Sequence, residues 1–241
     1  MLKMRCRNLI FFYIKGEVGM NIKEISEDRL VIFKDKNTLT IKEHEQLISL
    51  MQQIEESMMP ILNVNVSYKA VTVQWDIFKM DVNDVKENIQ TLIKNLDHIK
   101  IETLEKKIVE IPVCYDSEFG IDQDKFDMQI EELIELHTKN EYHVYMLGFL
   151  PGFMYLGGLD ERLYKERLDT PRKKIDKGSV GIAGSQTGVY PQNAPGGWNI
   201  IGRTPIEMVK EGIPIVRPGD YVKFNSISID EYRRLSDDKN N

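Results

Sequence analysis

The chain has 241 residues, of which 41% are hydrophobic and 29% are charged, with a formal net charge of −6 and two cysteines. This composition is typical of a soluble globular protein with one large domain or two ordinary ones, and an acidic balance without a local Lys/Arg cluster excludes nucleic acid as the partner. Two cysteines are too few for a disulfide scaffold, so we expect a cytoplasmic protein whose partners are small molecules or other proteins.

Residues 1–19 form the first segment with a distinct character. They carry four basic side chains and one short apolar run, from Leu9 to Ile14. This run is about half as long as a bilayer span, and no small-residue cleavage site follows it, so we expect neither a membrane segment nor a signal peptide. Met20 offers an alternative start, and residues 1–19 would then be a non-native leader or disordered.

The next predicted elements are a strand and a helix. Residues 21–33 read as a strand with a polar turn at residues 26–28. A helix begins at Thr40, which forms a capping-box pair with Glu43, and it ends before Pro60. Apolar residues recur along this helix at helical spacing, namely Ile41, Leu47, Ile48, Met51, Ile54 and Met58.

A hairpin and a second helix follow. Residues 64–77 alternate apolar and polar side chains on both sides of a turn at Tyr68-Lys69, which is typical of a hairpin with one wet face. Asp81 caps a helix that runs to Leu96. The order βαββα, closed by a strand near residues 107–113, predicts a ferredoxin-like α/β domain at residues 20–105.

The rest of the chain has a different pattern. One more helix is predicted at residues 122–137, and from Tyr142 onward short apolar runs are separated by Gly and Pro every eight to twelve residues or so. This spacing predicts an all-β barrel or sandwich at residues 106–235, followed by a polar tail at residues 236–241. The predicted fold class is therefore α+β.

Most familiar catalytic motifs are missing from the sequence. It has no G-x-x-x-x-G-K-[ST] loop, no G-x-S-x-G elbow, no H-E-x-x-H pair and no kinase signature set. Its four histidines are scattered, so we expect no metal site. Any ATP chemistry must therefore use another kind of cradle.

The segment from Gly178 to Ser185 repeats glycine every third residue. Successive backbone N–H groups in such a segment can bind an anion. Tight barrel turns, or strands that approach one another closely, require the same glycines. The spacing alone does not decide between these two interpretations.

Two arginines lie in rigid neighbourhoods with few other charges. Arg172 follows a proline in DTPRKK, and Arg203 lies in IIGRTP. A guanidinium held in this way is suited to bidentate binding of a carboxylate or phosphate. A structural arginine bonded to loop carbonyls is the equal alternative. Gln186, Tyr190 and Trp198 add the uncharged polar and aromatic groups that a small-molecule pocket requires.

Three stretches of the second half resemble the family of 5-oxoprolinase B subunits. They are YHVYMLGFLPGFMYLGGLDERL, TPRKKIDKGSVGIAGSQTGVYPQNAPGGWNIIGRTP and RPGDYVKF. The resemblance is nearly continuous from Ile111 to Phe224 and weaker in the first domain. The same family includes the Kip-type inhibitor of a sporulation histidine kinase and was long labelled allophanate hydrolase subunit 1.

The resemblance implies a second domain that is a cyclophilin-like β-barrel. It also implies an enzyme, because family members pair with a larger C subunit and act with an A subunit to open 5-oxo-L-proline to L-glutamate. ATP with Mg²⁺ drives that reaction, and the interface with the C subunit is where we expect ATP. The paired subunits are also similar to the carboxyltransferase half of urea carboxylase.

With this resemblance, the candidate residues form one hypothetical site in which Arg172 and Arg203 supply positive charge to a lactam substrate. Gln186 and Tyr190 orient the ring amide, and Trp198 lines the side that faces the C subunit. The residues expected to bind phosphate or the substrate carboxylate are Gly178, Ser179, Gly181, Gly184 and Ser185.

Two other functions stay open at this stage. The chain could be a non-catalytic inhibitor that docks on a sensor histidine kinase, or one component of a related urea or amide carboxyltransferase-type enzyme. The sequence also departs from the family text, since Glu166-Arg167 stands where a first Pro-Arg pair is common.

Overall fold

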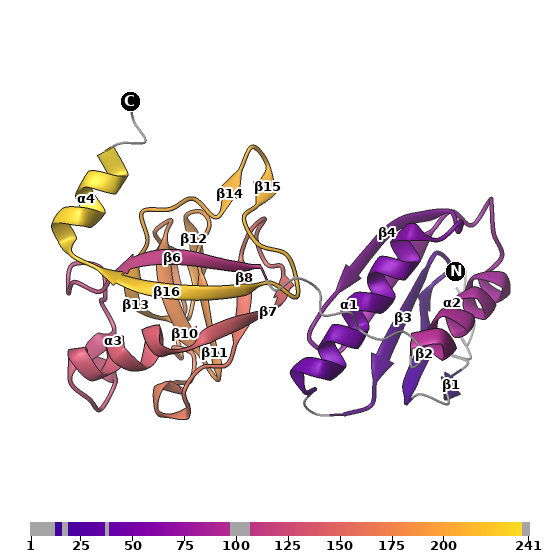
Figure 1. The fold of residues 1–241 in the computed structure, drawn as a ribbon, viewed down its shortest axis with the longest axis horizontal. Helices are drawn as coiled ribbons and strands as arrows, with labels where there is room; N and C mark the ends of the chain where they lie inside the picture. The colour runs from indigo at the N-terminus through magenta and orange to yellow at the C-terminus, as the bar shows by residue number, and fades with distance from the viewer. Residues whose placement is uncertain (1–12, 16–18, 37–38, 97–106, 238–241) are drawn as a thin grey trace, which may run out of the picture. The chain divides into compact units, whose positions relative to one another are not determined.

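A computed structural model describes residues 13–15, 19–36, 39–96 and 107–237. The chain divides into two compact units, residues 1–102 and residues 103–241, which we call the N-terminal unit and the barrel unit (Figure 1). Most of the expected leader, and the expected tail beyond residue 237, lie outside the described residues. Within the described ranges, no helix has both the length and the apolar character needed to span a membrane.

The N-terminal unit is a five-stranded antiparallel sheet with two helices. Its strand order is β1-β2-β3-β5-β4. One core joins the sheet to both helices, with Leu30, Val73, Trp75, Leu47 and Ile89 among its buried members. The bounds are β1 Tyr13–Lys15, β2 Met20–Ser26, β3 Arg29–Lys34, α1 Ile41–Glu56, β4 Ile61–Val66, β5 Ala70–Trp75 and α2 Val82–Leu96.

Local sequence signals explain these helices and the second hairpin. The Thr40 side chain accepts the Glu43 N–H, and the Glu43 carboxylate accepts the Thr40 N–H at 3.0 Å, so the predicted capping box is confirmed. The Asp81 side chain accepts the Asn83 N–H at 2.8 Å at the start of α2. The predicted turn at Tyr68-Lys69 joins β4 to β5.

The ferredoxin-like strand order is not confirmed. Residues 21–33 form two strands, β2 and β3, because the polar turn at residues 26–28 closes a tight hairpin. Strand β2 then occupies the sheet position beside β3 that the predicted closing strand would have taken. The prediction that a strand near residues 107–113 closes this sheet was wrong, since β6 (Ile108–Cys114) belongs to the barrel.

The barrel unit is built on a closed seven-stranded barrel of order β10-β11-β8-β7-β16-β6-β13. Strands β6 and β16 pair in parallel along their whole length, and β16 also pairs antiparallel with β7 (Figure 1). The predicted barrel class is therefore correct, and the cyclophilin-like assignment stays a prediction. The other bounds are β7 Glu141–Leu147, β8 Met154–Gly157, β10 Ser179–Ala183, β11 Gln186–Val189, β13 Asn199–Arg203 and β16 Tyr221–Ile227.

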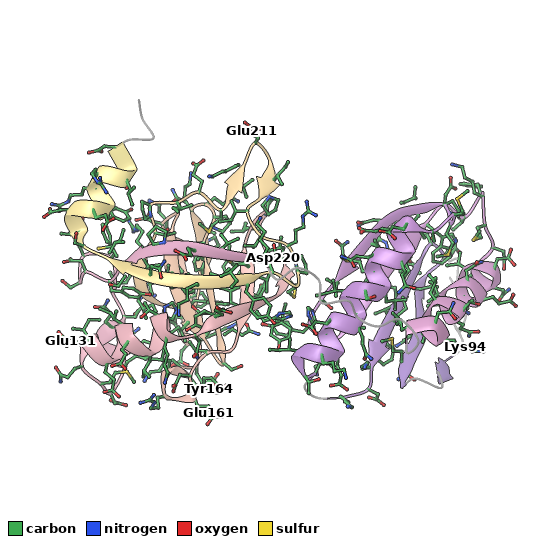
Figure 2. All side chains as sticks on the ribbon, in the orientation of Figure 1. Lys94, Glu131, Glu161, Tyr164, Glu211 and Asp220 are labelled. Carbon is green, nitrogen blue, oxygen red and sulfur yellow. The ribbon has the colours of Figure 1, made fainter. Side chains whose placement is uncertain are left out.

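Shorter elements surround the barrel. Strands β9 (Arg172–Ile175) and β12 (Ala194–Gly196) form a two-stranded ribbon, and β14 (Val209–Lys210) pairs with β15 (Ile213–Pro214). Glu211 lies at the tip of the β14–β15 hairpin with φ of 52° (Figure 2). Two 3-10 turns, η1 (Gln123–Lys125) and η2 (Glu161–Leu163), and helix α4 (Ile229–Asp237) complete the unit.

The predicted helix at residues 122–137 begins later than expected, as α3 (Ile130–Lys139). The Asp122 N–H donates to the Ile200 carbonyl at 3.0 Å, and the Asp122 carboxylate accepts the Ile200 N–H at 2.7 Å. These bonds tie residue 122 to β13, and the segment between it and Ile130 forms only the short 3-10 turn η1 instead of the predicted first turns of an α-helix.

A series of hydrogen-bonded polar side chains is buried in the barrel core, from α3, β11 and the residue that follows β6. The Thr187 hydroxyl donates to the Gly181 carbonyl, so it must accept from Nε2–H of His137, at 2.8 Å. Nδ1 of His137 then accepts the Tyr115 hydroxyl at 2.7 Å. Burial lowers the pKa of His137 to about 3, so this imidazole is neutral throughout the physiological range.

Candidate functional site

Four aromatic side chains of the barrel unit pack together, and we call Phe153, Tyr155, Tyr190 and Trp198 the aromatic cluster. The centroid of the Phe153 ring lies 5.0 Å from that of Tyr155, 5.2 Å from that of Tyr190 and 5.2 Å from that of Trp198. All three pairs meet edge to face, which is a favoured arrangement for aromatic rings. The β9–β12 ribbon contributes Ile175 and Ala194 to the same cluster.

The aromatic cluster lies on the outer face of the barrel, and the glycines leave room for it. Successive side chains of a strand point to opposite faces, and Val180 and Ile182 of β10 face the barrel core. A Cβ at Gly181 would lie 3.1 Å from Trp198 Cβ, and one at Gly188 would lie 2.5 Å from the Met154 carbonyl oxygen. Gly188 is therefore required by the close approach of the Met154 backbone, and a side chain at residue 181 would crowd Trp198.

Tyr190 is buried at the base of the aromatic cluster. Burial raises its pKa to about 12, although a hydrogen bond with the backbone of Trp198 acts in the opposite direction. Its phenol is therefore protonated at neutral pH and can act as a hydrogen-bond donor. A Cβ at Gly196 would lie 2.2 Å from this hydroxyl, so β12 approaches it closely only because residue 196 is glycine.

Arg172 is held beside this cluster by a buried carboxylate. Its Nη2 donates to Asp122 Oδ1 at 2.6 Å, and its Nη1 donates to the Trp198 carbonyl at 3.4 Å. The Arg172 side chain is 27% exposed, whereas that of Asp122 is 1% exposed. The side chain is thus partly open to solvent, while both terminal nitrogens of the guanidinium are held by the Asp122 carboxylate and the Trp198 carbonyl.

Asp122 organises this corner of the barrel unit and was missed by sequence analysis. Oδ1 also accepts the Lys125 Nζ at 2.7 Å, in addition to the bond from Arg172. Burial alone would raise the pKa of Asp122, but the hydrogen bonds from Arg172, Lys125 and the Ile200 N–H outweigh it and lower that pKa. The carboxylate is therefore charged at neutral pH. In the sequence, Asp122 is one acidic residue in a segment rich in acidic residues, so nothing distinguishes it from its neighbours.

Arg203 lies at the other end of β13 and has different contacts. Its Nη2 donates to Asp176 Oδ2 at 3.0 Å, and its guanidinium lies 4.9 Å from the centroid of the Phe119 ring. Its Nε is buried without a hydrogen-bond partner in the described part of the chain. The structure therefore does not bring Arg203 together with Arg172, although both were predicted for one site.

The backbone amides of the glycine-rich segment are already engaged. The Gly178 N–H donates to the Tyr190 carbonyl at 2.8 Å, the Ser179 N–H to the Asp176 carbonyl at 3.2 Å, and the Gly184 N–H to the Lys165 carbonyl at 2.7 Å. Gly181 lies within β10, which pairs with a strand on each side. This arrangement favours the barrel-turn interpretation over the anion cradle.

Ser185 and Gln186 lie at the turn between β10 and β11. Gly184 at this turn has φ of 57°, a conformation that glycine adopts without strain. Gln186 begins β11, and Tyr190 follows its last residue, so the two lie about 13 Å apart at strand spacing. The role predicted for this pair, orienting one ring amide, stays a prediction.

This face of the barrel can therefore bind and orient a small anionic or carbonyl-bearing group rather than supply a nucleophile. Arg172 offers a fixed guanidinium beside the Trp198 backbone carbonyl, and the half-buried Tyr155 packs against the buried Trp198 ring. Among the described residues, no group of three or more His, Cys, Asp or Glu side chains could hold a metal ion.

The fold and this face define the class of protein. A family model for the carboxyltransferase domain, subdomain C and D, matches residues 20–212, which include most of both units. The chain is therefore a carboxyltransferase-domain protein.

Two relatives define the family more narrowly. The 5-oxoprolinase B subunit of Bacillus subtilis is 43% identical over 170 residues, covering 68% of this chain and 68% of the relative. The 5-oxoprolinase B subunit of Haemophilus influenzae is 37% identical over 212 residues, covering 85% and 97%. The chain belongs to the family of 5-oxoprolinase B subunits, as the sequence resemblance predicted.

Solved structures show similar folds. A conserved uncharacterized protein from Pyrococcus horikoshii has a TM-score of 0.51 at 39% identity, covering 88% of this chain and 99% of that one. The protein TTHA0988 has a TM-score of 0.71 at 25% identity, with 83% of this chain and 39% of that one covered. Urea carboxylase of Kluyveromyces lactis, at 16% identity and a TM-score of 0.74, shows the fold alone over 95% of this chain and 24% of its own. The chain thus spans well under half of the last two proteins.

Proposed function

We propose that this chain is the B subunit of an ATP-dependent 5-oxoprolinase, which opens 5-oxo-L-proline to L-glutamate together with an A subunit and a C subunit. The observation that carries the proposal is the 43% identity, over 170 residues, to a protein named as the B subunit of 5-oxoprolinase. The fixed guanidinium of Arg172 beside an aromatic surface supports it, because 5-oxoproline is a small carboxylate with a ring amide.

The chemistry of the reaction indicates what this chain would contribute. Opening the lactam breaks the ring C–N bond, adds the hydroxyl of water to the carbonyl carbon and transfers a proton to the ring nitrogen. Negative charge develops on the carbonyl oxygen during this step, and a pre-oriented cation stabilises it. Arg172, fixed by Asp122, is placed for that role or for binding the substrate carboxylate.

The neighbouring aromatic residues would orient the substrate. Trp198 packs edge-on against Phe153 and Tyr155, so its ring position is fixed. The protonated phenol of Tyr190 sets the position of the Trp198 backbone. In this proposal Arg172 faces the substrate and the buried Trp198 ring supports it from below, while the roles predicted for Gln186 and Arg203 stay predictions.

The described residues do not fit a self-contained site for ATP and Mg²⁺. The amides of Gly178, Ser179 and Gly184 donate to carbonyl oxygens, and no described cluster of carboxylates could hold the metal ion. We therefore assign ATP binding to a partner subunit or to a surface that a partner completes, and derive no step of the reaction from it.

Co-expression with an A subunit and a C subunit of a 5-oxoprolinase tests the proposal. The purified complex should release glutamate from 5-oxoproline only with ATP, and omission of this chain should abolish the release. Arg172→Ala should lower kcat/KM by about 100-fold or more, as expected when a group that stabilises developing charge is lost.

Lys174→Ala is the matched control, because Lys174 is a cation of the same strand with a solvent-exposed side chain. It should leave kcat/KM within about twofold. Full activity of Arg172→Ala would contradict the assignment of that residue. A complex without glutamate release, combined with stoichiometric inhibition of a sensor kinase by this chain alone, would favour the inhibitor instead.

A further inference from the structure

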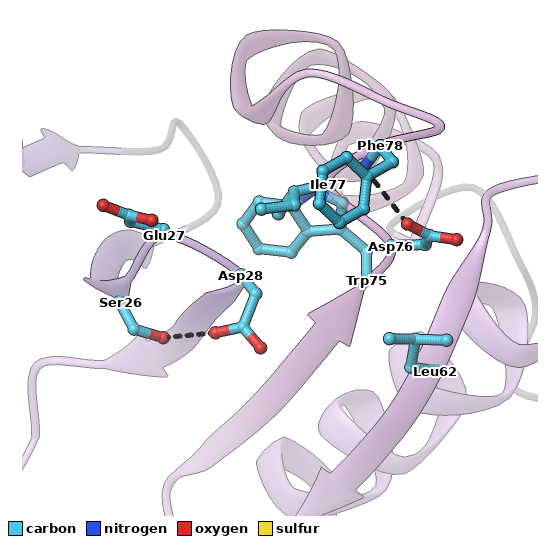
Figure 3. Close-up of a pocket in the computed structure, with 8 residues that line it drawn as sticks. All are labelled: Ser26, Glu27, Asp28, Leu62, Trp75, Asp76, Ile77 and Phe78. Atoms are coloured by element: carbon cyan, nitrogen blue, oxygen red, sulfur yellow. Dashed lines mark hydrogen bonds between the residues drawn. The ribbon is translucent and has the colours of Figure 1, made fainter.

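The N-terminal unit has a surface cleft of about 500 Å³ at one end of its sheet (Figure 3). The β2–β3 turn forms one wall, and the end of β5 and the start of β4 form the other. We call it the acidic-apolar cleft. The described residues that line it are Ser26, Glu27, Asp28, Leu62, Trp75, Asp76, Ile77 and Phe78.

Large apolar side chains stand exposed around the acidic-apolar cleft. Phe78 is 95% exposed, Leu62 is 63% exposed and Ile77 is 42% exposed, whereas Trp75 below them is buried. In Figure 3 the Phe78 ring projects from the segment that follows β5. A cluster of exposed apolar side chains in one place is typical of a surface that another protein covers.

The charges that line the acidic-apolar cleft are all negative. Asp28 accepts the Ser26 hydroxyl and the Gln74 side-chain amide, each at 2.7 Å, and these bonds lower its pKa, so it is ionised at neutral pH. Asp76 accepts the Phe78 N–H at 3.1 Å, and Glu27 is exposed at the turn. None of the described lining residues is Lys, Arg or His.

Two cations flank the acidic-apolar cleft without filling it. Arg29 Nε lies 4.0 Å from Asp28, and Lys79 Nζ lies 3.4 Å from Asp76. Their side chains are 51% and 71% exposed, so they extend largely into solvent. Exposed pairs of this kind screen the carboxylates only in part, and the cleft favours a positively charged occupant.

The shape indicates a protein segment rather than a small molecule. Pockets for small ligands enclose most of the ligand surface, whereas Phe78 and Leu62 rise from an open surface. Among the described strands, β4 pairs only with β5, so its other edge is available beside the cleft. An extended segment could pair with β4 and place a side chain in the cleft.

We propose that the acidic-apolar cleft docks a segment of a partner subunit that carries a lysine or arginine next to an aliphatic or aromatic side chain. The proposal rests on the proposed function for the existence of that partner. The apolar side chain contacts Phe78 and Leu62, and the cation lies against Glu27, Asp28 and Asp76. Electrostatic attraction guides the encounter, and apolar burial supplies most of the affinity.

The test measures binding of the full chain to the partner subunits encoded beside it, by titration calorimetry at two salt concentrations. Phe78→Ser should weaken the Kd by about 30-fold, as for an aromatic residue at the centre of an interface. Glu27→Lys should weaken it by about threefold to tenfold, and more at low salt than at high salt.

Met58→Ser and Ile213→Ser are matched controls. Both side chains are exposed and apolar, and neither lines the acidic-apolar cleft. Both should leave the Kd within about twofold. Unfolding curves of all four variants should match that of the unmodified chain, since each changed side chain is exposed.

The outcomes separate the two proposals. A complex whose Kd is unchanged by Phe78→Ser and Glu27→Lys would overturn the docking proposal and leave the proposed function intact. The same loss in the two controls would also overturn it, because the effect would not be specific to the cleft. If the unmodified chain binds none of these subunits, both proposals fail together.

Discussion

The aromatic cluster of the barrel unit and the acidic-apolar cleft of the N-terminal unit differ in how far their aromatic side chains are exposed. The barrel unit buries Tyr190 and Trp198 beneath a ribbon and uses glycine at positions 181 and 188 to make the space. The N-terminal unit leaves Phe78 almost fully exposed beside carboxylates. Rigid packing fits a face that must hold Arg172 in one orientation, whereas exposed apolar groups fit a face that meets another protein. The comparison therefore separates the proposed binding face from the proposed docking face.

Gly188→Ala tests the packing half of the comparison and should have the largest effect. A Cβ at this position would lie 2.5 Å from the Met154 carbonyl oxygen, so backbone must move. We expect the free energy of unfolding of the barrel unit to fall by about 3 kcal/mol. Urea unfolding, followed by the fluorescence of Trp198, measures this loss.

Gly184→Ala is the control for that variant. Its φ of 57° disfavours alanine, but no atom lies within 4 Å of the added Cβ. The expected loss is about 1 kcal/mol, from backbone strain alone. Equal losses for the two variants would show that the close contact with the Met154 carbonyl costs no more than the backbone strain at residue 184.

Asp122→Ala tests whether the barrel unit depends on its buried carboxylate. Removing it leaves Arg172 and the Ile200 N–H without their acceptor, and we expect the free energy of unfolding to fall by about 3 kcal/mol. Asp176→Ala is the control, because the Asp176 side chain is 44% exposed and its ion pairs should contribute under about 1 kcal/mol. A larger loss for Asp176→Ala would reverse the assignment of the organising residue.

The two units should also differ in their response to acid. His137 has a pKa of about 3 in the folded barrel and about 6.5 when unfolded, so below pH 6.5 the unfolded state binds the extra proton. The free energy of unfolding of the barrel unit should then fall by up to about 1.4 kcal/mol per pH unit, until pH reaches about 3. Unfolding curves between pH 7 and pH 4 measure this slope.

In the N-terminal unit, the Glu43 carboxylate loses its stabilising effect over a lower pH range. Hydrogen bonds from Lys36 and then Thr40 lower the pKa of Glu43 to about 2. Their stabilising effect is present above the unfolded pKa of about 4.5 and is lost as pH falls towards 2. At pH 5 the barrel unit should therefore be weakened before the N-terminal unit. If both units lost stability together at pH 5 to 6, His137 would not be the cause.

Thr40→Ala should give the smallest effect, confined to the N-terminal unit. It removes the side-chain acceptor of the Glu43 N–H, at a cost of about 1 kcal/mol. Thr91→Ala, in the middle of α2, is the control and should change the free energy of unfolding by less than about 0.5 kcal/mol. Circular dichroism during urea unfolding distinguishes the two variants.

Sequence analysis predicted the elements that depend on neighbouring residues. The capping box at Thr40, the cap at Asp81 and the turn at Tyr68-Lys69 each involve groups within a few positions of one another. Long-range pairing was not predictable in this way. Strand β6 carries no mark that its partner is β16 rather than the first sheet, because an apolar run fits either.

For the candidate site, too, features of single residues were predictable and long-range contacts were not. Sequence analysis proposed Arg172, Tyr190 and Trp198 because rare residue types in rigid segments are visible without a structure, and the structure places these three residues near one another. It could not show that the glycine amides are engaged by carbonyls, nor that Asp122 lies next to Arg172, fifty positions later. Those facts depend on how β9, β13 and the segment before α3 meet.

The parallel pairing of β6 with β16 has a consequence for biosynthesis. Ile108 pairs with Tyr221, so β6 emerges from the ribosome long before its partner exists. At a synthesis rate of about 5–20 residues per second, β6 waits roughly 6–23 seconds for β16, and its other neighbour, β13, is also made long after it. An open apolar strand can pair with another nascent chain, so the barrel unit should depend on chaperones during translation, and a truncation before β16 should aggregate rather than fold.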